Sequence, residues 1–190
     1  MYVLILCSVF TVAVIIQKVL MFRRISKSDR NGLLERVKAK VTAGDFDGAQ
    51  NECLSESSPF SNVLYAGISQ HDKSDAAVES AMERRISEEV MKLEEYTGIV
   101  GTIGNTAVYI GLFGTVIGIM KAFHDISTMG QGGMNTVIVG VSEALIATAM
   151  GLLVAIPSVV AFNYFMTRID RIMKEMEICA SELYDYLKHR

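Results

Sequence analysis

The sequence predicts an all-α membrane protein with three transmembrane helices, which cytoplasmic helices extend into a bundle. Apolar residues make up 51% of the 190 residues, and the mean hydropathy is +0.33. Three long runs are nearly free of charge: residues 1–17 and 97–120 carry none, and residues 126–167 carry only Glu143. A helix of about 20 apolar residues crosses a bilayer core about 30 Å thick, so the second and third runs are long enough to span.

The first run is marginal in length, and it suffices if Lys18 snorkels and residues 19–22 are included. The alternative is a signal peptide, but no basic residue precedes the apolar stretch and no small-x-small cleavage site follows it. Basic residues come after the run, which predicts that this end is cytoplasmic and that residue 1 is outside. They are Lys18, Arg23, Arg24, Lys27 and Arg30.

A second basic cluster follows the third run and indicates the same N-out, C-in topology. It consists of Arg168, Arg171 and Lys174. We therefore expect a first span at 1–22, a cytoplasmic helical domain at 23–96, a second span at 97–122, a short external loop at 123–134, a third span at 135–166 and a cytoplasmic C-terminal helix at 167–190.

The cytoplasmic domain has a mostly helical pattern. Leu33, Leu34, Val37 and Val41 recur at helical spacing, and Gly44 is placed to end that helix. Further on, Pro59 marks a break.

A longer helix is predicted to begin at Ser74 or Asp75, either of which can cap it. No breaker separates Leu93 from the second span, so we expect this helix to run unbroken into the membrane. Its apolar residues fall on one side: Val78, Met82, Ile86, Val90 and Leu93.

The C-terminal segment has apolar residues at alternating steps of three and four, which is a heptad pattern. They are Ile169, Ile172, Met176, Cys179, Leu183 and Tyr186. Such a stripe is best buried against other helices. Two interpretations stay open: a helical bundle shared between subunits, or one amphipathic helix packing on its own chain.

Several functional classes find no support. The net charge of −3 does not favour nucleic-acid binding, and no phosphate-binding loop of the form G-x-x-x-x-G-K-[ST] occurs. We expect no enzyme activity, cofactor or metal site, since the histidines are scattered and the acidic pairs Asp45/Asp47 and Asp72/Asp75 look like turns and caps. No disulfide is expected for Cys7, Cys53 or Cys179, because two lie in a reducing compartment and the first in the membrane.

Glu143 is the most informative residue. A carboxylate at mid-span costs about 2.5–3.5 kcal/mol, so such groups usually face a polar interior. The alternative is a residue near the span end that reaches water, but counting from Asn135 places Glu143 about 12 Å down the helix. A carboxyl group that titrates near neutral pH can take up and release a proton.

The surroundings of Glu143 predict a lined path. Small residues that allow close helix approach recur on both spans: Gly111, Gly114 and Gly118, and Gly140, Ala144, Ala147, Gly151 and Ala155. Thr115 is expected close to the depth of Glu143, where its hydroxyl can donate to a carboxylate. Thr148 is rotated about 140° from Glu143, so it would line another wall or contact a partner. Each threonine can instead bond its own backbone. One titratable group in three spans implies an oligomer or a partner helix.

Two motifs carry a resemblance to a known family. Gly111-Leu-Phe-Gly-Thr-Val-Ile-Gly-Ile-Met120 resembles the second-span signature of the MotA/TolQ/ExbB proton-channel family. Glu143-Ala-Leu-Ile-Ala-Thr-Ala-Met-Gly151, followed by Ala155-Ile-Pro157 and Asn163, resembles the third-span signature of its ExbB and TolQ branches. Three spans favour these branches over the longer MotA branch, with ExbB slightly preferred.

The resemblance implies a multi-pass motor subunit of the bacterial inner membrane. Five copies would surround a single-span partner of the ExbD or TolR kind, and proton flow would pass work to a TonB- or TolA-like protein. Glu143, Thr115 and Thr148 correspond to the functional polar residues of the family, and Pro157 to a helix-packing position. Two departures are that Ala107-Val-Tyr-Ile110 lacks the proline often found there, and that the outer segment before the first span is shorter than in longer members.

Other functions stay open beside an ExbB-type subunit. A TolQ-type role in envelope integrity is nearly as well supported, because the motifs barely separate the two. A passive oligomeric scaffold, in which Glu143 only bonds between helices, belongs to a different class. A substrate transporter is disfavoured, since neither an internal repeat nor broken helices are evident.

Overall fold

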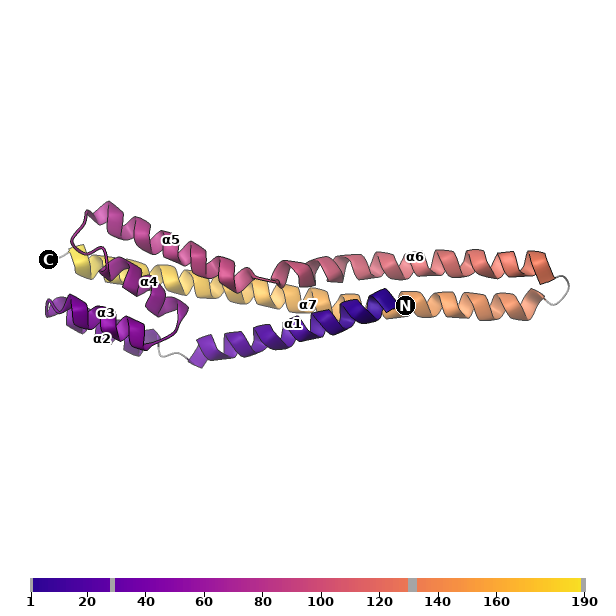
Figure 1. Cartoon of the computed structure of the whole chain (residues 1–190), viewed down its shortest axis with the longest axis horizontal. Coiled ribbons are helices and arrows are strands. Elements are labelled where there is room, and N and C mark those ends of the chain that lie inside the picture. Colours follow the sequence, from indigo (N-terminus) through magenta and orange to yellow (C-terminus); the bar gives the residue numbers. More distant parts are fainter. Residues whose placement is uncertain (1, 28–29, 130–132, 189–190) are drawn as a thin grey trace. The chain divides into compact units, whose positions relative to one another are not determined.

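The computed structural model describes residues 2–27, 30–129 and 133–188, which form helices and no strand (Figure 1). The all-α prediction is thereby confirmed. The helices are α1 (Tyr2–Lys27), α2 (Arg30–Thr42), α3 (Phe46–Ser55), α4 (Pro59–Ile68), α5 (Asp75–Glu94), α6 (Thr97–Met129) and α7 (Gly133–Lys188).

Three of these helices are long and apolar enough to cross a membrane. Their candidate spans are Tyr2–Ser26, Thr97–Ser127 and Val137–Lys188. The three predicted membrane helices are thus present in the structure.

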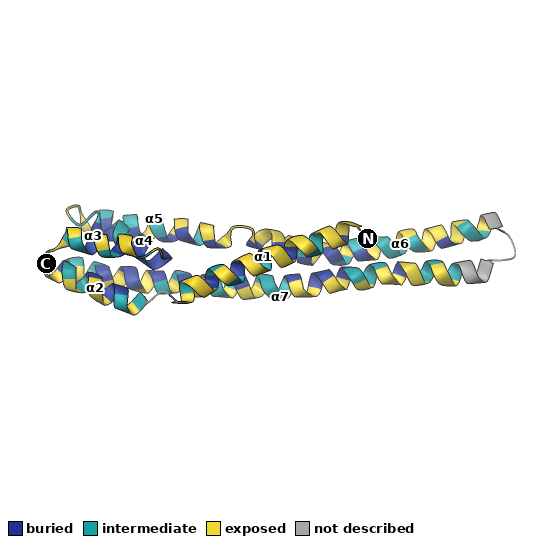
Figure 2. Cartoon of the chain, turned by 60° about the horizontal axis from the view of Figure 1, so that its bottom comes forward, coloured by how far each residue is buried: buried dark blue, intermediate teal, exposed yellow. Residues whose placement is uncertain are grey.

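The chain divides into two units, and the first comprises residues 1–18 and 96–165. It contains the N-terminal part of α1, α6 and the first part of α7. Helices α6 and α7 lie side by side as a hairpin in both ribbon views (Figures 1 and 2). Its hydrophobic core joins all three helices through Leu4, Ala107, Val154 and Ala155.

Most residues with large apolar side chains in this hairpin are exposed in the single chain, as the yellow stretches of α6 and α7 in Figure 2 indicate. Tyr109, Phe113, Leu145 and Leu153 are all more than 60% exposed in the single chain. Outward apolar side chains suit contact with lipid or with other membrane helices, where burial in the chain's own core is unnecessary.

The second unit comprises residues 19–95 and 166–190, and its helix boundaries follow the sequence signals. Gly44 ends α2 with a positive φ of 78°, and Asp45 caps α3 by accepting a hydrogen bond from the Gly48 backbone. Ser58 forms a capping box with Ser61, and Pro59 occupies the first turn of α4. Ser74 precedes α5 but makes no capping bond with its side chain.

The C-terminal heptad residues pack within their own chain. Five of the six are almost fully buried: Ile169, Ile172, Met176, Cys179 and Leu183. Tyr186 is the exception, at 49% exposure. A methyl group built on Gly67 would meet both Met82 of α5 and Leu183 of α7, which shows how closely these helices approach. The single chain therefore buries this stripe itself, as the own-chain interpretation predicts.

Two expectations were wrong. Helix α5 does not continue into α6, because Tyr96 adopts a left-handed φ of 62° and interrupts the helix. The predicted external loop 123–134 is largely helical: α6 continues to Met129 and α7 begins at Gly133. Lys18 is only 3% exposed in the single chain, and whether it snorkels in a bilayer stays a prediction.

Candidate functional site in the hairpin of α6 and α7

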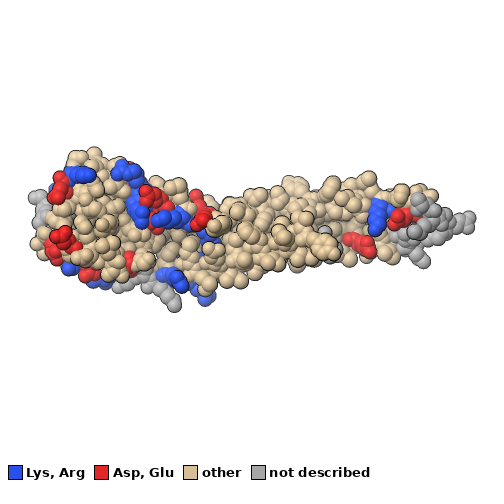
Figure 3. All heavy atoms as spheres, viewed as in Figure 1, with Lys and Arg blue, Asp and Glu red and all other residues tan. Residues whose placement is uncertain are grey.

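Charge in the hairpin of α6 and α7 is confined to one place. Between Tyr96 and Phe165 the sequence has three charged residues, Lys121, Asp125 and Glu143. All three line one cavity of about 400 Å³, which we call the charged groove. Its remaining lining residues are Gly118, Ala122, Val139 and Gly140. Figure 3 shows the small group of charged side chains near the turn between α6 and α7.

The groove forms because small residues make up its floor. A methyl group built on Gly118 would lie 2.7 Å from the Ala144 Cβ atom, and one on Gly140 would lie 2.6 Å from the Ala122 Cβ atom. The two backbones therefore approach more closely than larger side chains allow, and no bulky group fills the space beside Glu143.

The same close approach continues along the hairpin. A Cβ atom on Gly111 would lie 3.0 Å from the Ala147 carbonyl oxygen, and one on Gly114 would lie 2.8 Å from the Ala147 Cβ atom. One on Gly151 would lie 2.7 Å from the Ala107 carbonyl oxygen. Several of the predicted small-residue positions thus lie at the contact between α6 and α7. They are Gly111, Gly114, Gly118, Gly140, Ala144, Ala147 and Gly151.

Thr148 bridges the two helices at this contact. Its hydroxyl donates to the backbone carbonyl of Gly111 at 3.2 Å. It therefore bonds the neighbouring helix and not its own.

Thr115 lies elsewhere than expected. Its hydroxyl donates to the carbonyl of Leu112 on its own helix at 2.6 Å. The contact between Gly114 and Ala147 places Thr115 level with Ala147, about one turn from Glu143. The expectation that the two residues lie at similar depth counted from Lys121 and Asn135, whereas α6 extends to Met129 and α7 begins at Gly133, which accounts for the offset of about one turn.

Pro157 lies within α7 and is exposed in the single chain. Its neighbours Ser158 and Val159 are the residues that approach α6, at Gly104. Pro157 itself therefore lies off the contact between the two helices.

Sequence reasoning missed Lys121 and Asp125 as companions of Glu143. Their signal was available, since they are the other charged residues of the hairpin. It also missed Gly101 and Gly104. A methyl group built on Gly101 would lie 2.9 Å from the Phe162 ring. Gly101 and Gly104 are three residues apart, and Gly104 precedes Gly111 by seven residues, which is about two helical turns.

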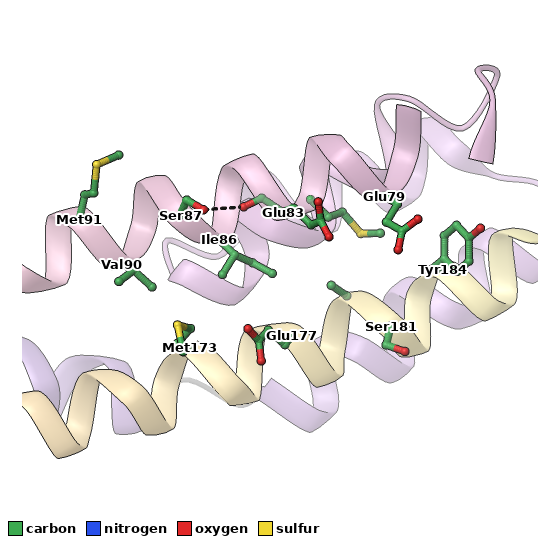
Figure 4. A pocket seen from close by; sticks show the side chains of 12 residues that line it. Glu79, Glu83, Ile86, Ser87, Val90, Met91, Met173, Glu177, Ser181 and Tyr184 are labelled. Carbon is green, nitrogen blue, oxygen red and sulfur yellow. Dashed lines mark hydrogen bonds between the residues drawn. The ribbon is translucent and has the colours of Figure 1, made fainter. Parts of the chain in front are cut away.

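A second cavity, of about 720 Å³, lies in the second unit between α5 and the C-terminal part of α7 (Figure 4). Figure 4 shows Ile86 and Val90 directed from α5 toward α7, with Met173 and Glu177 on the opposite wall. None of its lining residues belongs to the hairpin that contains Glu143.

The fold and the charged groove define a multi-helix membrane protein with charged side chains grouped in one groove along two closely packed apolar helices. The chain belongs to the MotA/TolQ/ExbB proton channel family, whose model matches residues 55–178. This match includes all of the hairpin and confirms the family resemblance of its two motifs.

Individual relatives come from two branches of this family. The Tol-Pal system protein TolQ of Pseudomonas aeruginosa is 43% identical over 113 residues, which cover 60% of this chain and 48% of TolQ. The biopolymer transport protein ExbB of Xanthomonas campestris pv. campestris is 38% identical over 109 residues, covering 57% of this chain and 43% of ExbB. The chain thus matches somewhat less than half the length of these relatives.

Proposed function

We propose that this chain is the channel-forming motor subunit of a bacterial inner-membrane complex that uses the proton motive force to energise outer-membrane transport, as an ExbB-type protein. The observation that carries the proposal is Glu143, a carboxyl group in a groove along two apolar helices of a proton-channel family member. One proton crossing 100 mV is worth about 2.3 kcal/mol, so a few protons per step can drive a sizeable rearrangement.

The exposure of Glu143 supports assembly around a shared path. In the single chain its side chain is exposed, beside Val139 and other outward apolar residues. A carboxylate facing lipid is costly, so in a bilayer another helix or water must cover this position. A ring of five copies around an ExbD- or TolR-like single-span helix would provide both, and a TonB- or TolA-like protein would carry the work onward.

The two threonines receive different roles in this proposal. Thr148 fixes the distance between α6 and α7 through its bond to Gly111. Thr115 is half-buried, and its oxygen can also accept a hydrogen bond from water in the path. The two basic clusters support the proposed N-out, C-in topology, in which the charged groove would lie toward the outer side.

The test is proton uptake by vesicles that contain the chain assembled with its partner proteins. Glu143→Gln keeps the size of the side chain but cannot exchange a proton, and we expect uptake to be abolished while the complex still assembles. Asp170→Asn is the matched control, since Asp170 lies exposed on α7 outside the hairpin. Normal uptake by an assembled Glu143→Gln complex would leave the passive scaffold as the better account.

A TolQ-type role is the second candidate, because relatives of both names match at similar identity. Proteins that co-purify with the chain from its native membrane separate the two roles. An ExbD- and TonB-like pair supports energised transport, and a TolR- and TolA-like pair supports envelope integrity.

A further inference from the structure

The three charged residues of the hairpin converge although they come from two helices. Lys121 and Asp125 are four residues apart and therefore share one face of α6, and Glu143 comes from α7. Each lines the charged groove. Charges that merely mark the aqueous end of a helix could point in any direction, so their common orientation toward one cavity calls for a joint role.

The groove has room for water. Its volume of about 400 Å³ exceeds many times the roughly 30 Å³ that a water molecule occupies in the liquid. Carboxylate and ammonium groups supply the hydrogen-bonding partners that hold water in such a space. The groove can therefore connect Asp125 to Glu143 without direct contact between the two side chains.

We infer that Asp125 is the outer proton acceptor that supplies Glu143, and that Lys121 sets the charge of this approach. The inference rests on the proposed proton-channel function. Asp125 takes a proton from the outer solution and releases it to a water molecule in the groove. That water gives up a proton to the Glu143 carboxylate, and Asp125 returns to its charged form.

Lys121 acts as a positioning residue in this sequence. Its side chain lines the same groove as the two carboxylates, and an ammonium group in that groove attracts the negative charge of either carboxylate. Among the described residues, Lys121, Asp125 and Glu143 are the titratable groups that line the groove; His124 is not one of its lining residues.

The experiment measures proton uptake against outer pH in vesicles containing the full assembled complex. We expect Asp125→Asn to reduce uptake on the order of tenfold and Asp125→Glu to retain it. We expect Lys121→Met to move the pH of half-maximal uptake upward by about one unit. His124→Gln, an adjacent change outside the groove, should match the wild type.

Glu143→Gln is the reference variant that distinguishes a failure of the proposed relay from a failure of the proposed function. If it abolishes uptake while Asp125→Asn and Lys121→Met behave as the wild type, the relay is wrong and the proposed function stands. If Glu143→Gln has normal uptake, the proposed function fails first. If Asp125→Asn does not assemble, Asp125→Glu and the pH profile of Lys121→Met decide, and an unchanged profile overturns the inference.

Discussion

Thr148 donates its hydroxyl hydrogen to the Gly111 carbonyl oxygen 3.2 Å away, across the contact between α6 and α7. The bond lies where Gly111 and Gly151 bring the two backbones together. It joins two positions of the family motifs. Thr148 therefore has a structural task in addition to any contact with the proton path.

Substitutions at Thr148 test its structural task, the hydrogen bond between α6 and α7. Thr148→Val removes the hydroxyl at similar size, and we expect it to destabilise the hairpin by about 0.6–1.7 kcal/mol, as for other hydrogen bonds within membranes. Thr148→Ser retains the donor and should stay close to the wild type. Thermal unfolding of the detergent-solubilised chain measures this difference, and equal stability of the two variants would contradict it.

Gly111 should tolerate no side chain. Gly111→Ala places a Cβ atom 3.0 Å from a carbonyl oxygen and 3.1 Å from the Thr148 Cα atom, and backbone cannot move aside as a flexible side chain would. We expect a loss of about 1–3 kcal/mol. Gly98→Ala is the control, because nothing lies within 4 Å of its Cβ position. A Gly111→Ala variant as stable as Gly98→Ala would show that the helices separate readily.

Lys38 links α2 to α7 in the second unit. Its ammonium group lies 2.6 Å from Glu182, and this hydrogen bond raises the pKa of Lys38 above 10.5 against the opposing effect of burial. The contribution to stability is therefore complete below pH 10.5 and is lost as the pH rises through the higher folded-state pKa. Because Glu182 is 46% exposed, we expect less than about 1 kcal/mol.

Glu182→Gln tests this pair. Its melting temperature at pH 8 should lie slightly below that of the wild type, and the difference should shrink above pH 11. Glu94→Gln changes an exposed carboxylate on a different helix, α5, and its effect on the melting temperature should show no such pH dependence. A difference that persists undiminished in strong base would mean that packing and not charge is responsible.

The buried thiols of the second unit should be unreactive. Burial raises the pKa of Cys53 to about 12, and it also raises the pKa of Cys179. At pH 8 both are protonated, and the thiolate is the reactive form. We expect maleimide to modify them only after denaturation in dodecyl sulfate, as measured by mass spectrometry. Ser57→Cys supplies an exposed reference thiol, and native labelling of Cys53 at the same rate would be inconsistent with this fold.

The sequence predicts the membrane helices well because hydrocarbon demands long apolar segments. Glu143 is recognisable for the same reason, since a charge in such a segment is conspicuous. Local signals also locate Gly44 and Asp45 correctly, because positive φ and helix capping depend on the residue itself. These features require no knowledge of how helices pair.

Features that depend on how helices pack against each other were not predictable from the sequence. The register of α6 against α7 decides that Lys121 and Asp125 line the same groove as Glu143 and that Thr115 does not, and no single helix contains that information. The break at Tyr96 has a similar origin. A left-handed tyrosine is unfavourable by itself, so its surroundings must stabilise it, and neither glycine nor proline marks the position.

Glycine and alanine at the contact between α6 and α7 also affect the thermodynamics of the hairpin. Neither residue has side-chain rotamers to lose, whereas each leucine or isoleucine immobilised at such a contact loses about 0.5–1 kcal/mol of conformational freedom. Bringing Gly118 against Ala144 and Gly140 against Ala122 therefore orders the helices at almost no side-chain entropy cost. The spacing of α6 and α7 beside Glu143 is consequently set by backbone atoms and alanine methyl groups, which have few alternative arrangements.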